Sequence, residues 1–358
     1  MSEAVLTIQS HTGPYCARFD EDGLERLDAD VPAGAHFIID AKVADLYRPR
    51  MAHILASASV LLIEAVEPAK SLERFPAYVE HLVAQGLRRD HVLIAIGGGI
   101  IQDITCFLSA TMLRGVPWRF YPTTLLAQCD SCIGSKSSIN CGAAKNILGT
   151  FTPPREVVIS TRFLDTLDLR DLRSGIGEML KVHAIAGPEV FADFAARYDS
   201  MLAGRPEMIK AIRRALEIKQ GYIEGDEFDQ GPRLVFNLGH SFGHAMEAAT
   251  DFAIPHGIAV SIGLDMANWM SSALKIGTEA HWRAGHGVLK KNYRGFETTP
   301  IPLDRFLAAL AKDKKNKGAG SVTLILPDAQ GRIFRDTYPA DAAFQALCAR
   351  YLTEVRAS

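Results

Sequence analysis

The chain has 358 residues, 48% of them hydrophobic, and a formal net charge of -2. This length is enough for two domains of ordinary size, each with its own hydrophobic core. The 39 basic residues are balanced by 41 acidic ones without a long basic run, which argues against nucleic-acid binding. We therefore expect small metabolites, and no nucleic acid, as ligands.

The sequence predicts neither a membrane span nor a secretion signal. Its longest apolar stretches, such as residues 59–63, are far shorter than the ~20 residues that a transmembrane helix needs. Glu3 also stands where a signal peptide would be basic. The six cysteines are spread along the chain, with one CxxC at residues 129–132, and we interpret them as reduced thiols. A cytoplasmic protein without a membrane partner is expected.

Short apolar runs separated by helix-like segments dominate the first part of the sequence. Residues 71–85 have apolar side chains at helical spacing, and Gly86 follows as a stop signal. Buried strands are expected at residues 36–40, 59–65, 91–96, 118–121 and 156–159. Such alternation is typical of parallel strands joined by helices, so an α/β fold is predicted.

Beyond about residue 161, amphipathic helical patterns prevail. Helices are expected at residues 206–223, 240–249, 257–274 and 303–311. One exception is the segment 322–334, which predicts a β-hairpin across an Asp/Gly turn. We place the domain boundary near residue 155, with an α/β domain at 1–155 and a mostly α-helical domain at 156–358.

Three glycines follow the strand that ends at Ile96. They are Gly97, Gly98 and Gly99, and a helical pattern comes directly after them. Glycines at such a turn let backbone N–H groups approach a phosphate, and the helix N-terminus favours negative charge. The turn therefore indicates a dinucleotide pyrophosphate site, although it lacks the GxGxxG fingerprint. A tight crossover without a ligand is the alternative interpretation.

A second group of residues has the types and spacing of metal ligands. His240 and His244 are four residues apart and share one face if their segment is helical, and His256 follows a dozen residues on. Upstream, Glu178 and Lys181 are three residues apart on a helical pattern. One Glu and two His leave an open position on zinc, as catalytic sites do. Core or capping histidines are the alternative.

Lysines beside small residues form the third group. Lys136 follows Gly134 and Ser135, and Lys145 precedes Asn146. Such side chains suit an anionic, phosphorylated ligand, although a solvated loop has a similar composition.

Taken in this order, the segments resemble dehydroquinate synthase and its relatives, the sugar phosphate cyclases. The resemblance covers almost the whole chain. It includes the glycine turn with Asp103, the stretch MLRG at 112–115, PTTLLAQ at 122–128, Asp130, Lys136, Lys145–Asn146, Glu178 with Lys181, Lys219, Arg233 and NLGHSFGHAME from Asn237. Many anchors at matching separations are more specific than any single motif.

The resemblance implies a Rossmann-like NAD-binding α/β domain, a helical domain that holds zinc or cobalt, and a homodimer. It also implies a reaction of the shikimate pathway. A hydroxyl of 3-deoxy-arabino-heptulosonate 7-phosphate is oxidised by NAD, phosphate is eliminated, the ketone is reduced again, and an intramolecular aldol step closes a carbocycle. NAD is regenerated in each cycle, and zinc serves as Lewis acid and template.

By residue matching, the resemblance also assigns individual roles. The metal ligands are Glu178, His240 and His256. The catalytic groups are Asp130, Lys181, Lys219 and His244. The substrate-binding residues are Arg114, Lys136, Asn146, Arg233, Asn237 and Lys314 or its neighbour Lys315. The NAD-binding residues are Asp40, Glu67, Lys70, Gly98, Gly99, Ile100, Asp103, Thr123, Thr124, Leu126, Asp130 and Lys145.

Four positions depart from the family pattern, and they leave the substrate open. Gln102 stands for a glycine, Ser135 for a glycine, Leu234 for an asparagine and Lys42 for an asparagine. Arg233 is a fixed charge suited to a carboxylate, which favours the heptulosonate. The alternatives are a cyclase for another seven-carbon sugar phosphate such as sedoheptulose 7-phosphate, a metal-dependent polyol or glycerol dehydrogenase, and a non-catalytic binding homologue.

Overall fold

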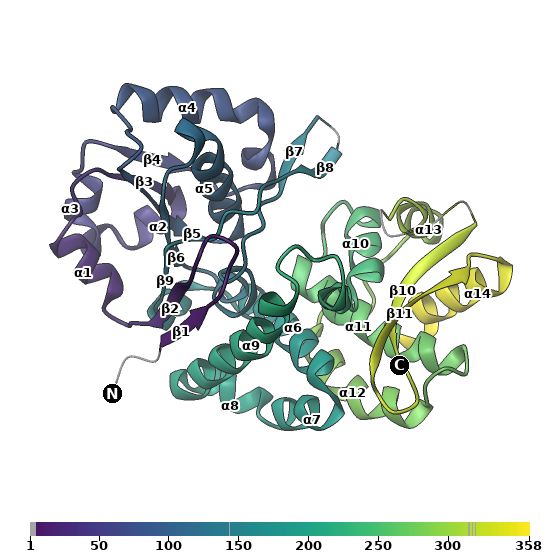
Figure 1. Ribbon diagram of the computed structural model, residues 1–358. Coiled ribbons are helices and arrows are strands. Elements are labelled where there is room, and N and C mark those ends of the chain that lie inside the picture. The colour runs from purple at the N-terminus through teal and green to yellow at the C-terminus, as the bar shows by residue number, and fades with distance from the viewer. Residues whose placement is uncertain (1–4, 143, 314–315, 317, 319) are drawn as a thin grey trace. The chain divides into compact units, whose positions relative to one another are not determined.

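The computed structural model describes residues 5–142, 144–313, 316, 318 and 320–358 (Figure 1). The chain divides into two compact units. The first unit consists of Met1–Leu167 and Gln220–Phe228, and the second of Asp168–Lys219 and Asp229–Ser358.

A seven-stranded sheet forms the centre of the first unit, in the order β1-β2-β9-β6-β5-β3-β4. The strands are β1 (Val5–Ile8), β2 (Tyr15–Phe19), β3 (Ala35–Asp40), β4 (Val60–Ile63), β5 (Val92–Gly97), β6 (Trp118–Pro122) and β9 (Glu156–Ile159). Neighbouring strands are parallel except for the β1–β2 pair. The five expected strands are confirmed, whereas the β1–β2 hairpin was not anticipated from the sequence. Because β9 pairs with β2 and β6, the unit continues past residue 155.

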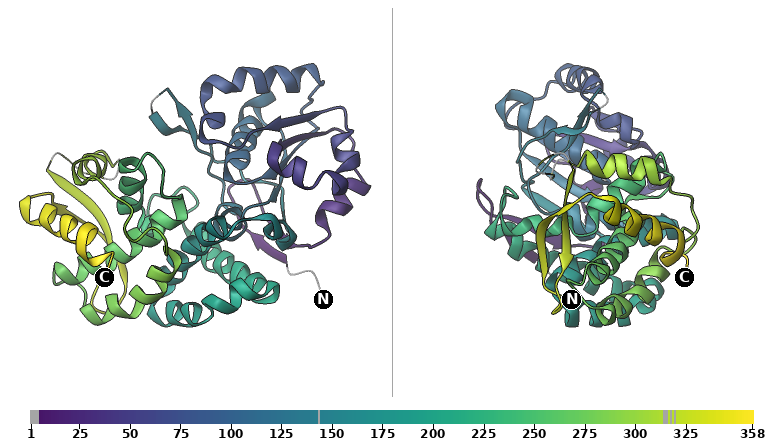
Figure 2. Two further views of the ribbon diagram at one scale, coloured as in Figure 1. Left: turned by 180° about the vertical axis from the view of Figure 1, so that it is seen from behind. Right: turned by 90° about the vertical axis from the view of Figure 1, so that its right-hand side faces the viewer.

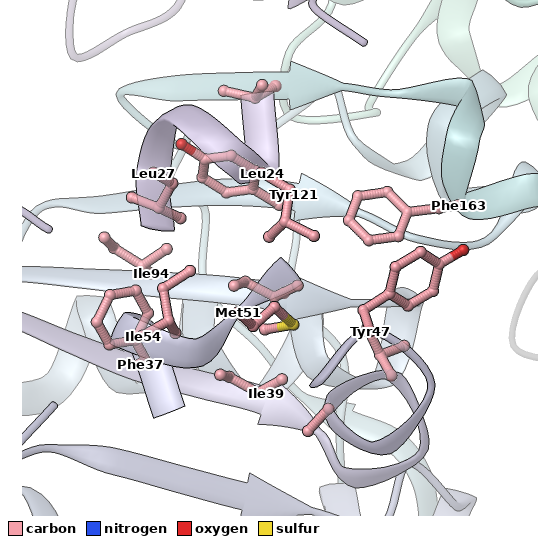
Figure 3. Close-up of a cluster of buried hydrophobic side chains, with 14 residues drawn as sticks. Leu24, Leu27, Phe37, Ile39, Tyr47, Met51, Ile54, Ile94, Tyr121 and Phe163 are labelled. Carbon is pink, nitrogen blue, oxygen red and sulfur yellow. The ribbon is translucent and has the colours of Figure 1, made fainter. Parts of the chain in front are cut away.

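Helices cover both faces of this sheet (Figure 1). On one face lie α1 (Gly23–Ala29), α2 (Ala41–Leu46) and α3 (Ala52–Leu55); on the other lies α5 (Gly99–Thr111), beside α4 (Phe75–Ala84). Figure 3 shows the apolar cluster of the first face, in which Phe37, Ile39 and Ile94 of the strands meet Leu24 and Ile54 of the helices. Side chains alternate between the faces of a strand, so β3 and β5 are buried on both sides.

A small hairpin of β7 (Ile139–Cys141) and β8 (Ala144–Leu148) stands out from the sheet, as Figures 1 and 2 show. Every described side chain of β8 is exposed.

The second unit is mostly helical. Its elements are α6 (Leu169–Ala186), α7 (Pro188–Ala196), α8 (Tyr198–Ala203), α9 (Arg205–Gly225, whose last residues group with the first unit), α10 (His240–Ala249), α11 (His256–Ala273), α12 (Glu279–Asn292), α13 (Leu303–Ala311), α14 (Ala342–Arg350) and the hairpin β10 (Ser321–Pro327) with β11 (Ile333–Pro339). Helix α11 is central, because its residues 257–271 are buried against α6, α10 and α12. The expected helices, the hairpin and the predicted fold class are confirmed.

Throughout the described part of the chain, no helix combines the length and the apolar character needed to cross a membrane.

Candidate metal centre and nucleotide-binding edge

The carboxyl ends of four adjacent parallel strands meet at one edge of the sheet. Asp40 ends β3, Gly97 ends β5, and Thr123 and Thr124 directly follow β6. The 3₁₀ turn Glu67–Lys70 comes after β4. In open parallel sheets, ligands bind at this edge. The structure therefore gathers sequence-predicted NAD-binding residues from four separate segments.

The glycine turn leaves the start of α5 accessible to a phosphate. Gly98 precedes the helix without a side-chain cap, and Ile100 lies in its first turn. A Cβ added to Gly98 would lie 2.9 Å from Cγ2 of Thr124, whereas one on Gly99 would meet nothing within 4 Å. Glycine is therefore required for the close approach at 98, and the space at 99 is open. The first N–H groups of α5 can face an anion there.

A partly buried ion pair joins this helix to the turn after β4. Lys70 Nζ lies 3.0 Å from Asp103 Oδ2, 3.7 Å from Glu67 Oε1 and 3.0 Å from Asn146 Oδ1. The other oxygen of Asp103 accepts a hydrogen bond from the backbone N–H of Ser138. Burial raises the pKa of Asp103 to about 6, although the ammonium of Lys70 opposes the shift. The predicted substrate residue Asn146 thus contacts a predicted NAD residue.

Asn140 completes the network and was missed by sequence reasoning. Its Nδ2 donates to Glu67 Oε1 at 2.9 Å, and its Oδ1 accepts from the backbone N–H of Asn146 at 2.8 Å. The hairpin is thereby tied to the edge of the sheet. No local pattern in the sequence marks Asn140, because its partners are distant along the chain.

The other predicted residues of the first unit lie in loops and turns. Leu126 and Asp130 belong to the segment after β6, where Ala127–Ser131 is a π-helical turn. Lys145 is in β8, and Lys136 forms a bridge with Phe151. Arg114 follows the other end of α5, a 13-residue helix about 20 Å long. The structure does not bring Arg114 to the glycine turn within one chain.

In the second unit, three helices bring a carboxylate and three imidazoles together. Glu178 is on α6, His240 and His244 are on α10, and His256 begins α11. Glu178 Oε1 lies 3.6 Å from Nε2 of His240 and 3.2 Å from Nε2 of His256. One ring nitrogen from each of the three histidines lies within 4.8 Å of the others. Donor atoms of a tetrahedral zinc site are about 3.3–3.5 Å apart, so Glu178, His240 and His256 fit such an ion.

The close packing of α10 against α11 depends on glycine. Gly239, which precedes His240, has a φ of +76°, and its added Cβ would lie 2.9 Å from backbone atoms of Val260 and Leu264. A Cβ on Gly263 of α11 would lie 2.1 Å from the carbonyl oxygen of Gly239. Side chains at these positions would separate the helices that carry His240 and His256.

Glu247 is a further acidic group at this centre, and sequence reasoning missed it. Its carboxylate lies 3.2–3.3 Å from Nδ1 of His256, on the side of the ring opposite Glu178. Burial opposes protonation of His256, but its hydrogen bonds to Glu178 and Glu247 raise its pKa to about 10. Burial lowers the pKa of His240, helped by the charge of Lys181. The position of Glu247, three residues after His244 on one helix, was the available sequence signal.

The remaining predicted residues of the second unit lie on α6, on α9 and in the 3₁₀ turn Pro232–Asn237 that precedes α10. Lys181 Nζ lies 2.5 Å from Glu178 Oε2 and 5.4 Å from the ring centre of Phe236. Lys219 and Arg233 are buried, with 6% and 7% of their surfaces exposed. Asn237 Nδ2 donates to the backbone carbonyl of Leu234. Lys314 and Lys315 lie outside the described residues.

Comparison with known proteins connects the two units to one family. Residues 60–174 match the model of the 3-dehydroquinate synthase N-terminal domain, and residues 175–316 match that of the C-terminal domain. The chain is 35% identical to the 3-dehydroquinate synthase of Rhizobium meliloti (strain 1021) over 327 residues, which cover 88% of this chain and 86% of the relative. The chain belongs to the 3-dehydroquinate synthase family. The enzyme of that name from Xylella fastidiosa (strain 9a5c) is 38% identical over 84% of this chain and 80% of its own length.

A solved structure of the same architecture shows how far the fold is shared. The 2-epi-5-epi-valiolone synthase of Streptomyces hygroscopicus subsp. jinggangensis 5008, solved with NAD+ and Zn2+ bound, is 27% identical and has a TM-score of 0.81. The match covers 94% of this chain and 97% of that one. The family assignment therefore extends over both units.

Proposed function

We propose that the protein is an NAD- and zinc-dependent carbon–oxygen lyase that cyclises 3-deoxy-arabino-heptulosonate 7-phosphate with release of phosphate, as a 3-dehydroquinate synthase does. One observation carries the proposal: Glu178, His240 and His256 converge at zinc-site spacing in a chain 35% identical to an enzyme of that name. In this proposal, residues 1–155 bind NAD, and residues 156–358 bind the metal and the substrate.

The donor set at the metal centre supports the choice of zinc. Glu178 provides a carboxylate oxygen, and His240 and His256 provide imidazole nitrogens, a combination that zinc and cobalt both accept. When bound, the metal supplies Lewis-acid stabilisation of developing negative charge on the substrate. A ring nitrogen of His244 lies within 4.8 Å of those of His240 and His256, and we assign this side chain to the substrate. Glu247 holds His256 in the orientation that points Nε2 at the centre.

The edge of the sheet suits NAD. The open start of α5 fits the pyrophosphate, and we assign Asp40, at the end of β3, to a ribose. Lys70 is held by Asp103 and lies beside Asn146 at this edge, which supports its assignment to NAD binding. NAD supplies a hydride acceptor that is restored within each turnover.

Basic side chains of the second unit fit the remaining groups of an acidic sugar phosphate. Lys181 and Lys219 are buried ammonium groups that can orient hydroxyls and transfer protons. Arg233 is a buried guanidinium whose planar fork matches a carboxylate. Phosphate is assigned to Lys136, Asn146, Asn237, His244, Lys314 and Arg114, of which Arg114 lies at the far end of α5.

A panel of seven-carbon sugar phosphates tests the proposal. Phosphate should be released fastest from 3-deoxy-arabino-heptulosonate 7-phosphate, in the presence of NAD and without net NADH formation. Treatment with a chelator should abolish the activity, and zinc should restore it. Steady stoichiometric NADH formation from a polyol would indicate a dehydrogenase instead.

A second candidate substrate is favoured by one position. The side chain of Leu234, beside Arg233, offers no hydrogen bond where the family pattern has a side-chain amide. Faster phosphate release from sedoheptulose 7-phosphate would keep the cyclase proposal and replace its substrate.

We also propose a cytoplasmic homodimer, and light scattering of the purified protein tests the dimer.

A further inference from the structure

The π-helical turn Ala127–Ser131, which carries Asp130, is fastened to neighbouring elements at three places. At its start, the hydroxyl of Thr124 accepts a hydrogen bond from the backbone N–H of residue 127 at 3.2 Å. In its middle, the fully buried Gln128 donates through Nε2 to two backbone carbonyl groups, at 3.0 and 2.8 Å. Short π-helical segments cost regular hydrogen bonding and occur often at functional sites.

The third fastening is a reciprocal pair of hydrogen bonds between Gln102 and Ser131. Gln102 donates through Nε2 to the carbonyl of Ser131 at 2.5 Å, and the hydroxyl of Ser131 donates to Oε1 of Gln102 at 2.6 Å. The last carbonyl groups of a helical turn have no partner inside the turn, and Gln102 supplies one. Gln102 is only 6% exposed, so water does not readily replace these contacts.

Gln102 belongs to the helix that begins at the glycine turn. Its backbone N–H donates to the carbonyl of Gly98, and its neighbour Asp103 holds Lys70. The start of α5 is therefore tied on one side to Lys70 and on the other to Ser131. Because Asp130 directly precedes Ser131, the Gln102 contact holds the backbone beside Asp130 against the first turns of α5.

We propose that Gln102 is a positioning residue that fixes Asp130 with respect to the glycine turn, acting through Ser131. The inference rests on the proposed function, in which the turn binds the pyrophosphate of NAD, and on the catalytic role that the family resemblance implies for Asp130. A shift of about 1 Å in a group beside the reacting atoms costs on the order of 100-fold in rate. Replacing the Gln102 side chain leaves the backbone N–H groups at the start of α5 in place, so we expect a larger effect on turnover than on NAD affinity.

Two variants test the contact by removing different parts of it. Gln102→Met removes both hydrogen bonds at similar side-chain volume, and Ser131→Ala removes only the hydroxyl. In Gln102→Met, kcat should fall about 10- to 100-fold while KM for the sugar phosphate and zinc content stay unchanged. Ser131→Ala should lose less, and the double variant should be no slower than Gln102→Met alone. Full kcat in Gln102→Met overturns the proposal. If Gln102→Met does not fold, full kcat in Ser131→Ala overturns it instead.

A third variant distinguishes a positioning role from a purely structural one through the pH dependence of kcat. Gln102→Glu keeps the acceptor for the Ser131 hydroxyl, but its carboxyl group donates to the Ser131 carbonyl only when protonated. Its kcat relative to the wild type should therefore rise as pH falls. Gln85→Glu, on an exposed residue of the same unit, is the matched control and should show a constant ratio. A constant ratio in Gln102→Glu contradicts the proposal.

Hydrogen exchange separates this inference from the proposed function. If the wild type releases phosphate from no sugar phosphate, the proposed function fails, but the contact remains testable in the NAD complex. Backbone amides of residues 127–132 should then exchange faster in Gln102→Met than in the wild type or in Gln85→Glu. Unchanged exchange in Gln102→Met overturns the inference by itself.

Discussion

Gly177 of α6 and Gly257 of α11 face each other so closely that a Cβ on Gly177 would lie 2.1 Å from the carbonyl oxygen of Gly257. A Cβ on Gly257 would lie 1.8 Å from the carbonyl oxygen of Ser174. Each glycine is the chain neighbour of a proposed metal ligand, Gly177 of Glu178 and Gly257 of His256. The backbone approach of the two helices therefore sets the distance between these ligands.

Gly257→Ala should separate α6 from α11 and lower zinc content. Overpacking of a buried contact costs about 1–3 kcal/mol, so the free energy of unfolding should fall by that amount. Gly287→Ala is the matched control, because Gly287 is helical and an added Cβ there meets nothing within 4 Å. The control should be stabilised by up to about 1 kcal/mol and keep its zinc. Full zinc content in Gly257→Ala would show that the approach is not required.

Glu247→Gln should weaken zinc binding by about 10- to 100-fold, as loss of an outer carboxylate does at other metal sites. The physical reason is that the carboxylate at 3.2 Å from Nδ1 fixes the ring orientation of His256 and increases its basicity as a ligand. Competition with a chelator measures the zinc affinity without any activity assay. Glu279→Gln is the control, on a side chain that is 62% exposed, and should bind zinc as the wild type does.

Arg233→Ala should raise KM for the heptulosonate while zinc content remains unchanged. Loss of a buried charged contact corresponds to roughly 2–5 kcal/mol of binding free energy. Steady-state kinetics with 3-deoxy-arabino-heptulosonate 7-phosphate and with sedoheptulose 7-phosphate measures the effect on each substrate. An equal loss for the neutral sugar would argue against a carboxylate contact.

His183 should make the protein less stable in acid. Burial lowers its pKa to about 4, against 6.5 as the ordinary value, so the unfolded chain takes up the proton first as pH falls. The destabilisation due to His183 is absent above pH 6.5, grows as pH falls from there, and is complete at about pH 4. By linkage, this one group should cost about 2 kcal/mol between pH 7.5 and pH 5.

His183→Gln removes the titration but keeps a side-chain donor for the carbonyl of Met179, which Nδ1 of His183 now contacts at 2.7 Å. Urea unfolding at a series of pH values should show that the free energy of unfolding of the variant rises relative to that of the wild type as pH falls. Parallel stability curves would show that His183 does not carry the effect.

Local sequence patterns were enough to predict most helices and strands of this protein and many of the candidate residues at its metal centre and nucleotide-binding edge. The helix His240–Ala249 was predicted with its observed bounds, because the left-handed Gly239 and the apolar spacing act within a few residues. Spacing alone also placed His240 and His244 one turn apart. The strands β3 and β5 were predicted because each contains a buried apolar run, whereas β1 and β2 are short, partly exposed and lack that signal.

Tertiary structure alone decided which side chains meet. Glu178 and His256 are 78 positions apart in the numbering, and their contact depends on a helix approach that only glycines permit. Lys70 contacts Asn146 of the β7–β8 hairpin, and Gln102 contacts Ser131, which is 29 positions away in the sequence. Periodicity encodes how a segment folds by itself, but a contact between segments depends on backbone distance and side-chain volume at every interface between them.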